Sequence, residues 1–230
     1  MFRGALLAVA ACGFHGPGLI DDAHPPGDAP VARDAAPHPD ATPDAVPDAP
    51  PCTQHPSDLQ VAGGTLGGAG GSLQPALACA GSGIPVGLAL DVTQAPLGNH
   101  NNELAVVAIH VRCGTIIGGA TVLGEVITSG GAGTANCSSY ANPRPSTELL
   151  CPPGAAIVAI DGNELDTSLY NSVVVTCSNG TMLPFPTSGA WTNQPQHATC
   201  PPNTVVAGFA VRAGCGQDQL ALQCAALTCN

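Results

Sequence analysis

The chain has 230 residues, of which 44% are hydrophobic and only 9% are charged, so it can bury one sizeable core or two small ones. It contains no lysine, and its five arginines are scattered along the chain. Because no basic patch is available to neutralise phosphates, we expect neither nucleic acid nor an anionic membrane surface as a partner.

The first twelve residues, MFRGALLAVAAC, have the outline of a secretory signal peptide, because one arginine precedes a short apolar run that ends on small residues. Cys12 and the Gly13 that follows resemble the cleavage box of bacterial lipoproteins, in which the cysteine becomes the lipidated first residue. An ordinary signal peptide, or a longer one clipped by a wrongly assigned start, would give a similar run. We expect an exported protein on the cell envelope or outer surface, lipid-anchored at Cys12, or else a secreted one.

Residues 13–51 repeat Asp, Ala and Pro and hold seven of the 16 carboxylates of the chain. This composition offers too little apolar surface to offset the entropy of ordering, which predicts a disordered linker. Proline and like charges should keep the linker extended, as a stalk that separates residues 52–230 from the anchor.

The eleven cysteines indicate an oxidising compartment. No CxxC pair occurs, and no histidine pair lies at zinc-finger distance, so we predict disulfides and neither a metal nor a cofactor. If Cys12 carries lipid, ten cysteines remain, which is enough for five bridges.

Residues 52–230 contain a threefold repeat, marked by the glycine-rich stretches LGGAGG, SGGAGT and SGAWT. These begin at Leu66, Ser129 and Ser188, which are 63 and 59 positions apart. The repeats cover about residues 57–113, 114–177 and 178–230. In each repeat a cysteine opens an apolar stretch, a polar turn follows, and a second apolar stretch ends on another cysteine.

The second apolar stretch of each repeat alternates with a period of two, which predicts a β-strand. Counting back from the closing cysteines, the apolar positions are Val111 and Ile109, Val175 and Val173, and Leu222 and Leu220, with Arg112, Thr176 and Gln223 between them. The opening stretches are β-branched and lack helix caps. The domain is therefore predicted to be all-β, with roughly ten to twelve short strands.

An antiparallel hairpin brings its first and last residues side by side, where a disulfide can form. This predicts bridges from Cys79 to Cys113, from Cys151 to Cys177 and from Cys200 to Cys224, each stabilising by roughly 3 kcal/mol in the entropic model. Of the other cysteines, Cys52 with Cys229 would tie the ends of the domain together and Cys137 with Cys215 would join two loops, although sequence alone does not determine connectivity.

Three features of the second and third repeats stand out: the stretch SGAWTN before the opening of the third, the openings CPPG and CPPN, and the closing segments DTSLYNSVVVTC and DQLALQC. They resemble the repeat of the vitelline membrane outer layer protein family, and the resemblance covers residues of about 57 to 230. It implies a β-prism, in which three Greek-key sheets surround a pseudo-threefold axis as in jacalin-type lectins.

Polar turns would then gather near comparable ends of the three sheets, where carboxylates, amides and hydroxyls suit the paired donors and acceptors of a sugar. The candidate ligand-binding residues are Asn102, Glu103, Asp166, Thr167, Asn171, Gln217 and Asp218, with Tyr170 and Trp191 as apolar platforms. Asp and Asn are also favoured in tight turns for local reasons, so a purely structural role is the alternative.

Catalysis is not expected, because the sequence has no GxSxG, HExxH or phosphate-binding loop. Asp161, Glu164 and Asp166 are close in sequence but are expected to share one exposed loop, and His110 and His197 are each isolated. We therefore predict a tethered, lectin-like module that binds glycans. A structural envelope or coat protein is the alternative, and a hydrolase acting on polysaccharide is a weaker one. The sequence identifies no protein partner.

Overall fold

The computed structural model describes residues 51–94, 104–129, 143–165, 169–185 and 195–229. These residues form fourteen strands and no helix, which confirms the all-β class. Within the described ranges, therefore, no helical segment is long and apolar enough to cross a bilayer.

Three long antiparallel hairpins form the centre of the fold. They pair β4 (Ile84–Gln94) with β5 (Leu104–Ile117), β9 (Ile157–Leu165) with β10 (Leu169–Cys177), and β13 (Val205–Ala213) with β14 (Gln217–Cys229). The predicted alternation is confirmed, because the six apolar side chains at alternate positions before the closing cysteines are buried. Arg112, Thr176 and Gln223, which lie between them, remain partly exposed.

Each hairpin has a third strand beside its second one. β6 (Ala120–Thr128) pairs with β5, and β11 (Met182–Pro184) pairs with β10. In the third hairpin this place is taken by β1 (Thr53–Gly67), which pairs with β14. The first strand of the domain thus completes the sheet formed by its last two strands.

A fourth position, beside the first strand of each hairpin, is filled by strands that lead into the next hairpin. β7 (Arg144–Pro145) and β8 (Leu149–Leu150) pair with β4, and β12 (Pro195–Thr199) pairs with β9. β2 (Ser72–Leu73) and β3 (Leu77–Ala78) pair with β13 before the chain enters β4. Every group therefore receives its fourth strand from the segment before the next hairpin, in a closed cycle.

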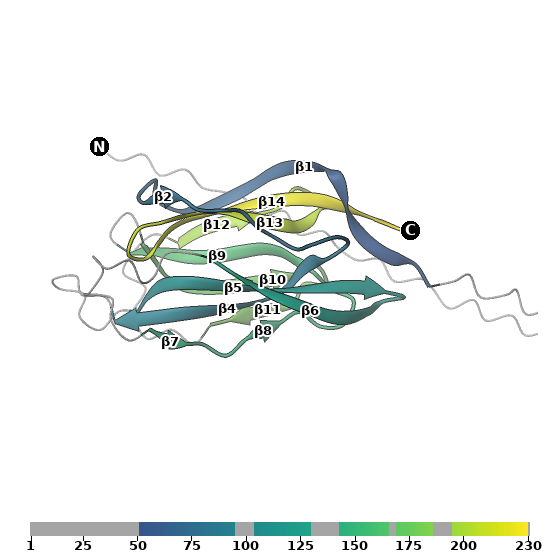
Figure 1. Ribbon diagram of the computed structural model, residues 1–230, viewed down its shortest axis with the longest axis horizontal. Helices are drawn as coiled ribbons and strands as arrows, with labels where there is room; N and C mark the ends of the chain where they lie inside the picture. Colours follow the sequence, from purple (N-terminus) through teal and green to yellow (C-terminus); the bar gives the residue numbers. More distant parts are fainter. Residues whose placement is uncertain (1–50, 95–103, 130–142, 166–168, 186–194, 230) are drawn as a thin grey trace, which may run out of the picture. The chain divides into compact units, whose positions relative to one another are not determined.

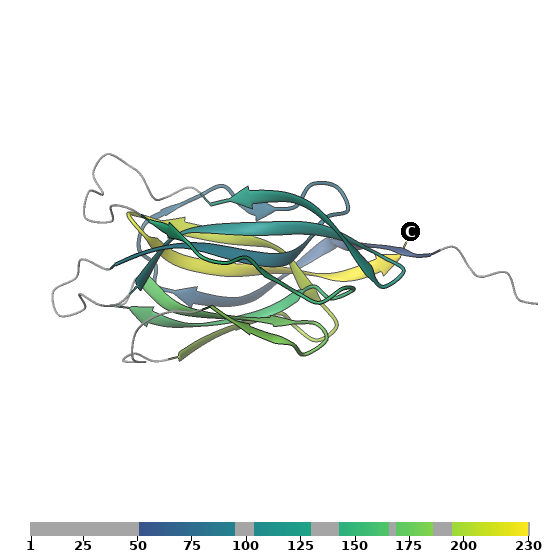
Figure 2. The ribbon, with the colours of Figure 1, turned by 90° about the horizontal axis from the view of Figure 1, so that it is seen from below.

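We call the three groups sheet 1 (β4 to β8), sheet 2 (β9 to β12) and sheet 3 (β13, β14 and β1 to β3). Each has the strand order of a Greek key, in which the fourth strand returns beside the first. This is the predicted three-repeat β-prism (Figures 1 and 2). Sheets 1 and 3 also touch through two residue pairs of β1 and β5, so their hydrogen bonds form one continuous ten-stranded array beside the four-stranded sheet 2.

The three predicted hairpin disulfides are present, with Cα–Cα distances of 5.7 Å in each bridge. The closing cysteines pair with Pro85, Ile157 and Val206, each six positions after the opening cysteine of its hairpin. A β-bulge follows at the next residue in all three hairpins. The repeats are thus equivalent in backbone register as well as in sequence.

The disulfides of neighbouring sheets lie at the same end of the prism. The backbone N–H of Cys151 donates to the carbonyl of Val86 (2.8 Å), and that of Cys200 donates to the carbonyl of Val158 (2.9 Å). Both acceptors are the bulge residues of the preceding sheet. We call this the disulfide end, on the right in Figure 1, and the opposite end, where β4, β9 and β13 finish, the turn end.

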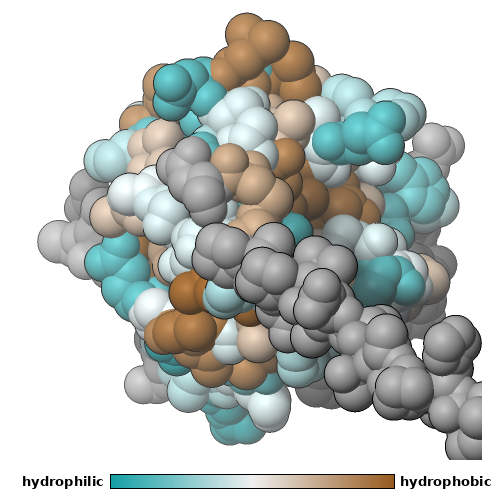
Figure 3. All heavy atoms as spheres, turned by 90° about the vertical axis from the view of Figure 1, so that its right-hand side faces the viewer, coloured by the Kyte–Doolittle hydropathy of each residue, from teal (hydrophilic) through white to brown (hydrophobic). Residues whose placement is uncertain are grey.

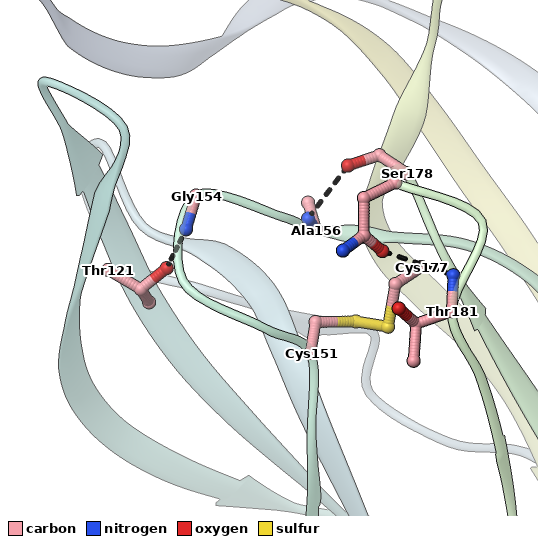
Figure 4. Close-up of a disulfide and its surroundings, with 8 residues drawn as sticks. Thr121, Cys151, Gly154, Ala156, Cys177, Ser178 and Thr181 are labelled. Carbon is pink, nitrogen blue, oxygen red and sulfur yellow. Dashed lines mark hydrogen bonds between the residues drawn. A yellow bond between two sulfur atoms is a disulfide. The ribbon is translucent and has the colours of Figure 1, made fainter.

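Figure 4 shows how the Cys151–Cys177 bridge is embedded at the disulfide end. The hydroxyl of Ser178 accepts a hydrogen bond from the backbone N–H of Ala156 (3.2 Å) beside the bridge. Thr121 of β6 accepts one from the N–H of Gly154 (2.9 Å). The segment that opens sheet 2 is therefore fastened to sheet 1 as well as to its own hairpin.

A fourth disulfide between described cysteines joins Cys52 to Cys229, 177 positions apart, as predicted. It links the start of β1 to the end of β14, two strands that no loop connects. The equivalent strands of sheet 1 are joined by the turn at Gly118 and Gly119. Cys215 is also disulfide-bonded. Its predicted partner Cys137 lies outside the described residues, so that pairing stays a prediction.

The inward faces of the three sheets enclose a single main core. Its buried members include Leu88 and Ile109 from sheet 1, Ile160 and Val175 from sheet 2, and Phe209 and Leu222 from sheet 3. A smaller cluster of Ile84, Val86, Ile116, Ala156 and Val205 joins sheets 1 and 3 to the segment that opens sheet 2, at the disulfide end. Aliphatic side chains thus supply most of the packing, as the low aromatic content of 3% requires.

Candidate functional site

The turn between β13 and β14 lies at the turn end and leads directly into Asp218. The loop of residues 67–71, which joins β1 to β2, packs against this turn. Asp218 as a whole residue is only 7% exposed. A carboxylate in such a position is uncommon, because burial removes most of its hydration.

Three glycines frame the carboxyl group of Asp218. A Cβ on Gly70 would lie 3.2 Å from its Cγ, and a Cβ on Gly214 would lie 3.1 Å from its Oδ2. A Cβ on Gly71, which has a φ of +60°, would overlap Oδ2. The glycine-rich stretch that marks the first repeat in the sequence therefore brings its backbone close to this carboxylate, where a larger residue would clash.

Opposing influences set the ionisation of Asp218. Burial is the largest and raises the pKa of the carboxyl group above its usual value. A hydrogen bond from the backbone N–H of Gly214 and the positive charge of Arg212 lower that pKa in part. The carboxylate is thus poorly hydrated but retains a donor and a nearby cation.

The glycine loop is attached to β13 of its own sheet and to β12 of sheet 2. Arg212 of β13 donates from Nε to the carbonyl of Gly70 (3.1 Å) and from Nη2 to the carbonyl of Gly71 (3.0 Å). At one end of the loop, the N–H of Gly67 donates to Oε1 of Gln196 in β12. Beyond the other end, the N–H of Gln74 donates to the carbonyl of Val211 (2.8 Å).

Gln217, the residue before Asp218, is fully buried, which corrects the expectation of an exposed turn residue. Its Nε2 donates to the carbonyl of Val107 in β5 at 3.0 Å. The side chain therefore joins sheet 3 to sheet 1 inside the prism, and its role in ligand binding stays a prediction.

The remaining predicted site residues are not brought together by the described part of the chain. Asn102, Glu103, Asp166, Thr167 and Trp191 lie outside the described residues, as does Cys12. Tyr170 and Asn171 belong to the start of β10. Their roles in ligand binding stay predictions.

Two histidines expected to be isolated each contact a carboxylate of an adjacent strand. His110 lies with Nε2 3.1 Å from Oδ2 of Asp91 and Nδ1 2.9 Å from Oγ1 of Thr128. His197 lies with Nδ1 2.6 Å from Oδ1 of Asp161. The prediction missed both pairs because it did not include the register between strands.

Asp161 and Glu164 belong to β9 and not to an exposed loop, which corrects a second expectation. Polar residues at the end of a strand resemble a loop when only the sequence is read. Among the described residues, no three His, Cys, Asp or Glu side chains gather as the ligands of a metal ion would.

The disulfide end offers a different kind of surface. A shallow cleft of about 200 Å³ lies there, lined by Ser82, Gly83, Gly114, Thr115 and Glu125 among others. Glu125 is exposed, in contrast to Asp218. Of the two places, only the turn end combines a buried carboxylate with a glycine frame.

No protein-family model and no curated protein matches the sequence. Among solved structures, the chain is similar to the Malaysian banana lectin, with 22% identity, a TM-score of 0.45, and coverage of 75% of this chain and 99% of the lectin. It is also similar to Calystegia sepium agglutinin, with 15% identity, a TM-score of 0.47, and coverage of 74% and 97%. A third similar structure is an artocarpin–mannotriose complex, with 15% identity, a TM-score of 0.44, and coverage of 73% and 97%.

Proposed function

We propose that this protein is an exported, non-catalytic carbohydrate-binding module with its sugar site at the turn end, around Asp218. One observation carries the proposal: the carboxylate of Asp218, a residue that is only 7% exposed, is framed by the backbone of three glycines. Burial of this charge raises the free energy of the folded state, and Arg212 and the N–H of Gly214 offset that cost only in part, so its presence suggests a ligand.

The chemistry of the site suits a sugar. An ionised carboxylate accepts hydrogen bonds only, and two neighbouring sugar hydroxyls can donate to its two oxygens. Glycines present backbone groups without side chains, so a sugar ring can approach closely. Both features favour a compact polyhydroxyl ligand over an extended apolar one.

We further propose that the signal peptide of residues 1–12, lipidation at Cys12 and the linker of residues 13–51 hold this module on the outer surface of the cell. Glycans would then be its partners, and the membrane would be contacted only through the N-terminal lipid. The resemblance of the repeats to the vitelline membrane outer layer family is retained as a hypothesis about ancestry.

A glycan array tests the proposal with the oxidised full chain and the Asp218→Asn and Asp161→Asn variants. Mannotriose and a biantennary N-glycan serve as the first probes, because these ligands are named for two of the similar lectin structures. We expect the wild-type protein to bind at least one glycan and Asp218→Asn to lose at least tenfold in affinity. Asp161→Asn, which alters a partly exposed carboxylate of sheet 2, should bind like wild type. An array on which the wild-type protein binds nothing contradicts the proposal.

A further inference from the structure

Arg212 contacts the two parts of the candidate site that are far apart in the sequence. It lies in β13, next to the turn that leads to Asp218, and its guanidinium binds the loop that follows β1. The two carbonyls that it binds belong to Gly70 and Gly71, and a Cβ on either glycine would meet the carboxyl group of Asp218. One side chain thus connects the frame of the site to the strand beneath it.

The position of this contact along the loop matters. Gln196 and Gln74 hold the chain at Gly67 and just beyond β2, whereas Arg212 holds the middle of the loop. Because Gly71 and Oδ2 of Asp218 are in close contact, a shift of the loop would change the space available beside the carboxylate. The guanidinium, with two parallel donors, is suited to fixing two successive carbonyls.

The charge of Arg212 also acts on Asp218. Three described elements pack against that carboxylate: β13, the loop of residues 67–71 and the β13–β14 turn. β13 contributes the charged Arg212. The loop and the turn contribute glycines, Ala69 and the disulfide-bonded Cys215, none of which titrates. Arg212 is therefore the cation that favours the ionised form of Asp218 there. It fixes the loop and supports the negative charge at the same time.

We propose that Arg212 is the positioning residue of the sugar site: it clamps the glycine loop beside Asp218 and extends sugar binding to lower pH by supporting the carboxylate. The inference rests on the proposed function for its biological meaning. The order of residues 67–71 and the ionisation of Asp218 can both be measured without any sugar.

The direction of the pH effect follows from the charges. Sugar hydroxyls donate to the ionised form of Asp218, so binding is lost as the pH falls through the pKa of that group in the folded protein. Burial raises this pKa and Arg212 opposes the rise. Without the guanidinium the pKa is higher still, and binding is lost at a higher pH on acidification. Lysine keeps the charge but not the paired donors, so Arg212→Lys separates the two roles.

The first experiment uses the sugar-free full chain. NMR titration follows the side-chain carboxyl carbon of Asp218, and hydrogen exchange follows the amides of residues 67–71. In Arg212→Gln we expect the titration midpoint to rise by about 0.5 to 1 pH unit and the loop amides to exchange at least ~10-fold faster. In Arg212→Lys the midpoint should stay near that of wild type while exchange is still accelerated.

Arg112→Gln is the matched control, because Arg112 binds Glu148 (2.8 Å) and the carbonyl of Gly124 (3.0 Å) on sheet 1. It removes an equal charge and similar hydrogen bonds, and should change neither readout. If Arg212→Gln leaves both the midpoint and the exchange rates at their wild-type values, the inference is wrong.

The second experiment measures sugar affinity by calorimetry between pH 4 and pH 8, with a glycan identified on the array. We expect the affinity of Arg212→Gln to fall off at a higher pH than that of wild type, and Arg212→Lys to recover the wild-type pH profile in part. An identical loss at every pH, without recovery by lysine, would reduce Arg212 to a merely structural residue. If the wild-type protein binds no glycan, the proposed function fails, and the sugar-free titration still decides the role of Arg212.

Discussion

The two ends of the prism differ in their covalent bridges and in their buried polar groups. The disulfide end carries three hairpin bridges, the Cys52–Cys229 bridge and the three bulges. The turn end of sheet 3 carries a glycine-rich loop, a buried amide and a buried carboxylate. Four disulfides whose cysteines are both described thus lie at one end, whereas the other end, which also contains the disulfide-bonded Cys215, holds the groups that are costly to bury.

The two ends also differ in the kind of side chain at their surfaces. Most exposed large apolar side chains lie on strand segments next to the bridges. Among them are Ile117, Val122, Leu123, Leu150 and Met182. Figure 3, which views the disulfide end, shows apolar patches separated by polar ones. At the turn end, the neighbours of Asp218 are glycine and arginine.

The largest effect should come from removing a bridge at the disulfide end. In the entropic model, replacing Cys52 and Cys229 by alanine lowers the free energy of unfolding by about 5 kcal/mol, because their bridge closes a very long loop. Replacing Cys200 and Cys224 lowers it by about 3 kcal/mol, because that loop is short. Guanidinium unfolding measures both values. Equal losses, or a larger loss for the short loop, would show that loop length does not govern the stability of this end.

At the turn end, Gly71→Ala should reduce sugar affinity at least ~10-fold, about 1.4 kcal/mol, because its Cβ would overlap Oδ2 of Asp218. Gly81→Ala is the matched control, since Gly81 has a similar φ of +58° but no atom within 4 Å of the point where an added Cβ would lie. Both variants carry similar backbone strain, so calorimetry on the two separates that strain from the overlap of the added Cβ with Asp218 and with the backbone of Ala213. Similar affinities in the two variants would show that the glycines around Asp218 do not form part of the sugar site.

A smaller effect is expected on stability when the buried charge is removed. The pKa of Asp218 is raised in the folded protein, so folding favours the protonated form, and the ionised form destabilises the fold once the pH exceeds the usual Asp value. Asp218→Asn should therefore raise the thermal midpoint at pH 7. The gain should shrink as the pH falls through the raised pKa of Asp218 in the folded protein, and it should have vanished below the pKa of an unfolded aspartate. A gain that is independent of pH would mean that charge is not its cause.

The smallest effect is expected for a pair on the outer face of sheet 2. The side chain of His197 is 70% exposed, and its contact with Asp161 is open to solvent. His197→Ala should change the free energy of unfolding by less than about 1 kcal/mol. A larger loss in chemical denaturation would show that the pair contributes to the sheet beyond a surface contact.

The sequence predicted what depends on neighbours along the chain. The alternation before Cys113, Cys177 and Cys224 marks strands, and a hairpin brings its two cysteines together whatever the rest of the fold does. The sequence did not predict which strands from elsewhere in the chain complete each sheet. The pairing of β1 with β14 is set by closure of the prism, and no local pattern in residues 53–67 indicates it.

The contacts of the candidate site were not predicted, because they join segments that are far apart in the sequence. Asp218 was predicted as a polar turn residue, and LGGAGG as a repeat marker, but their contact joins positions 147 residues apart. The pairing of His110 with Asp91 was missed because it depends on register across bulged strands. Gln217 was misjudged because a polar residue in a turn gives no sign of which way its side chain points.

The most direct measurement is an NMR map of backbone amide shifts on addition of a glycan that the array identifies. We predict that the shifts concentrate in residues 67–71 and 212–218 at the turn end, and that residues 79–83 and 113–115 at the disulfide end do not move. Shifts centred on the Cys79–Cys113 bridge, or no shifts in sheet 3, would contradict a sugar site at Asp218.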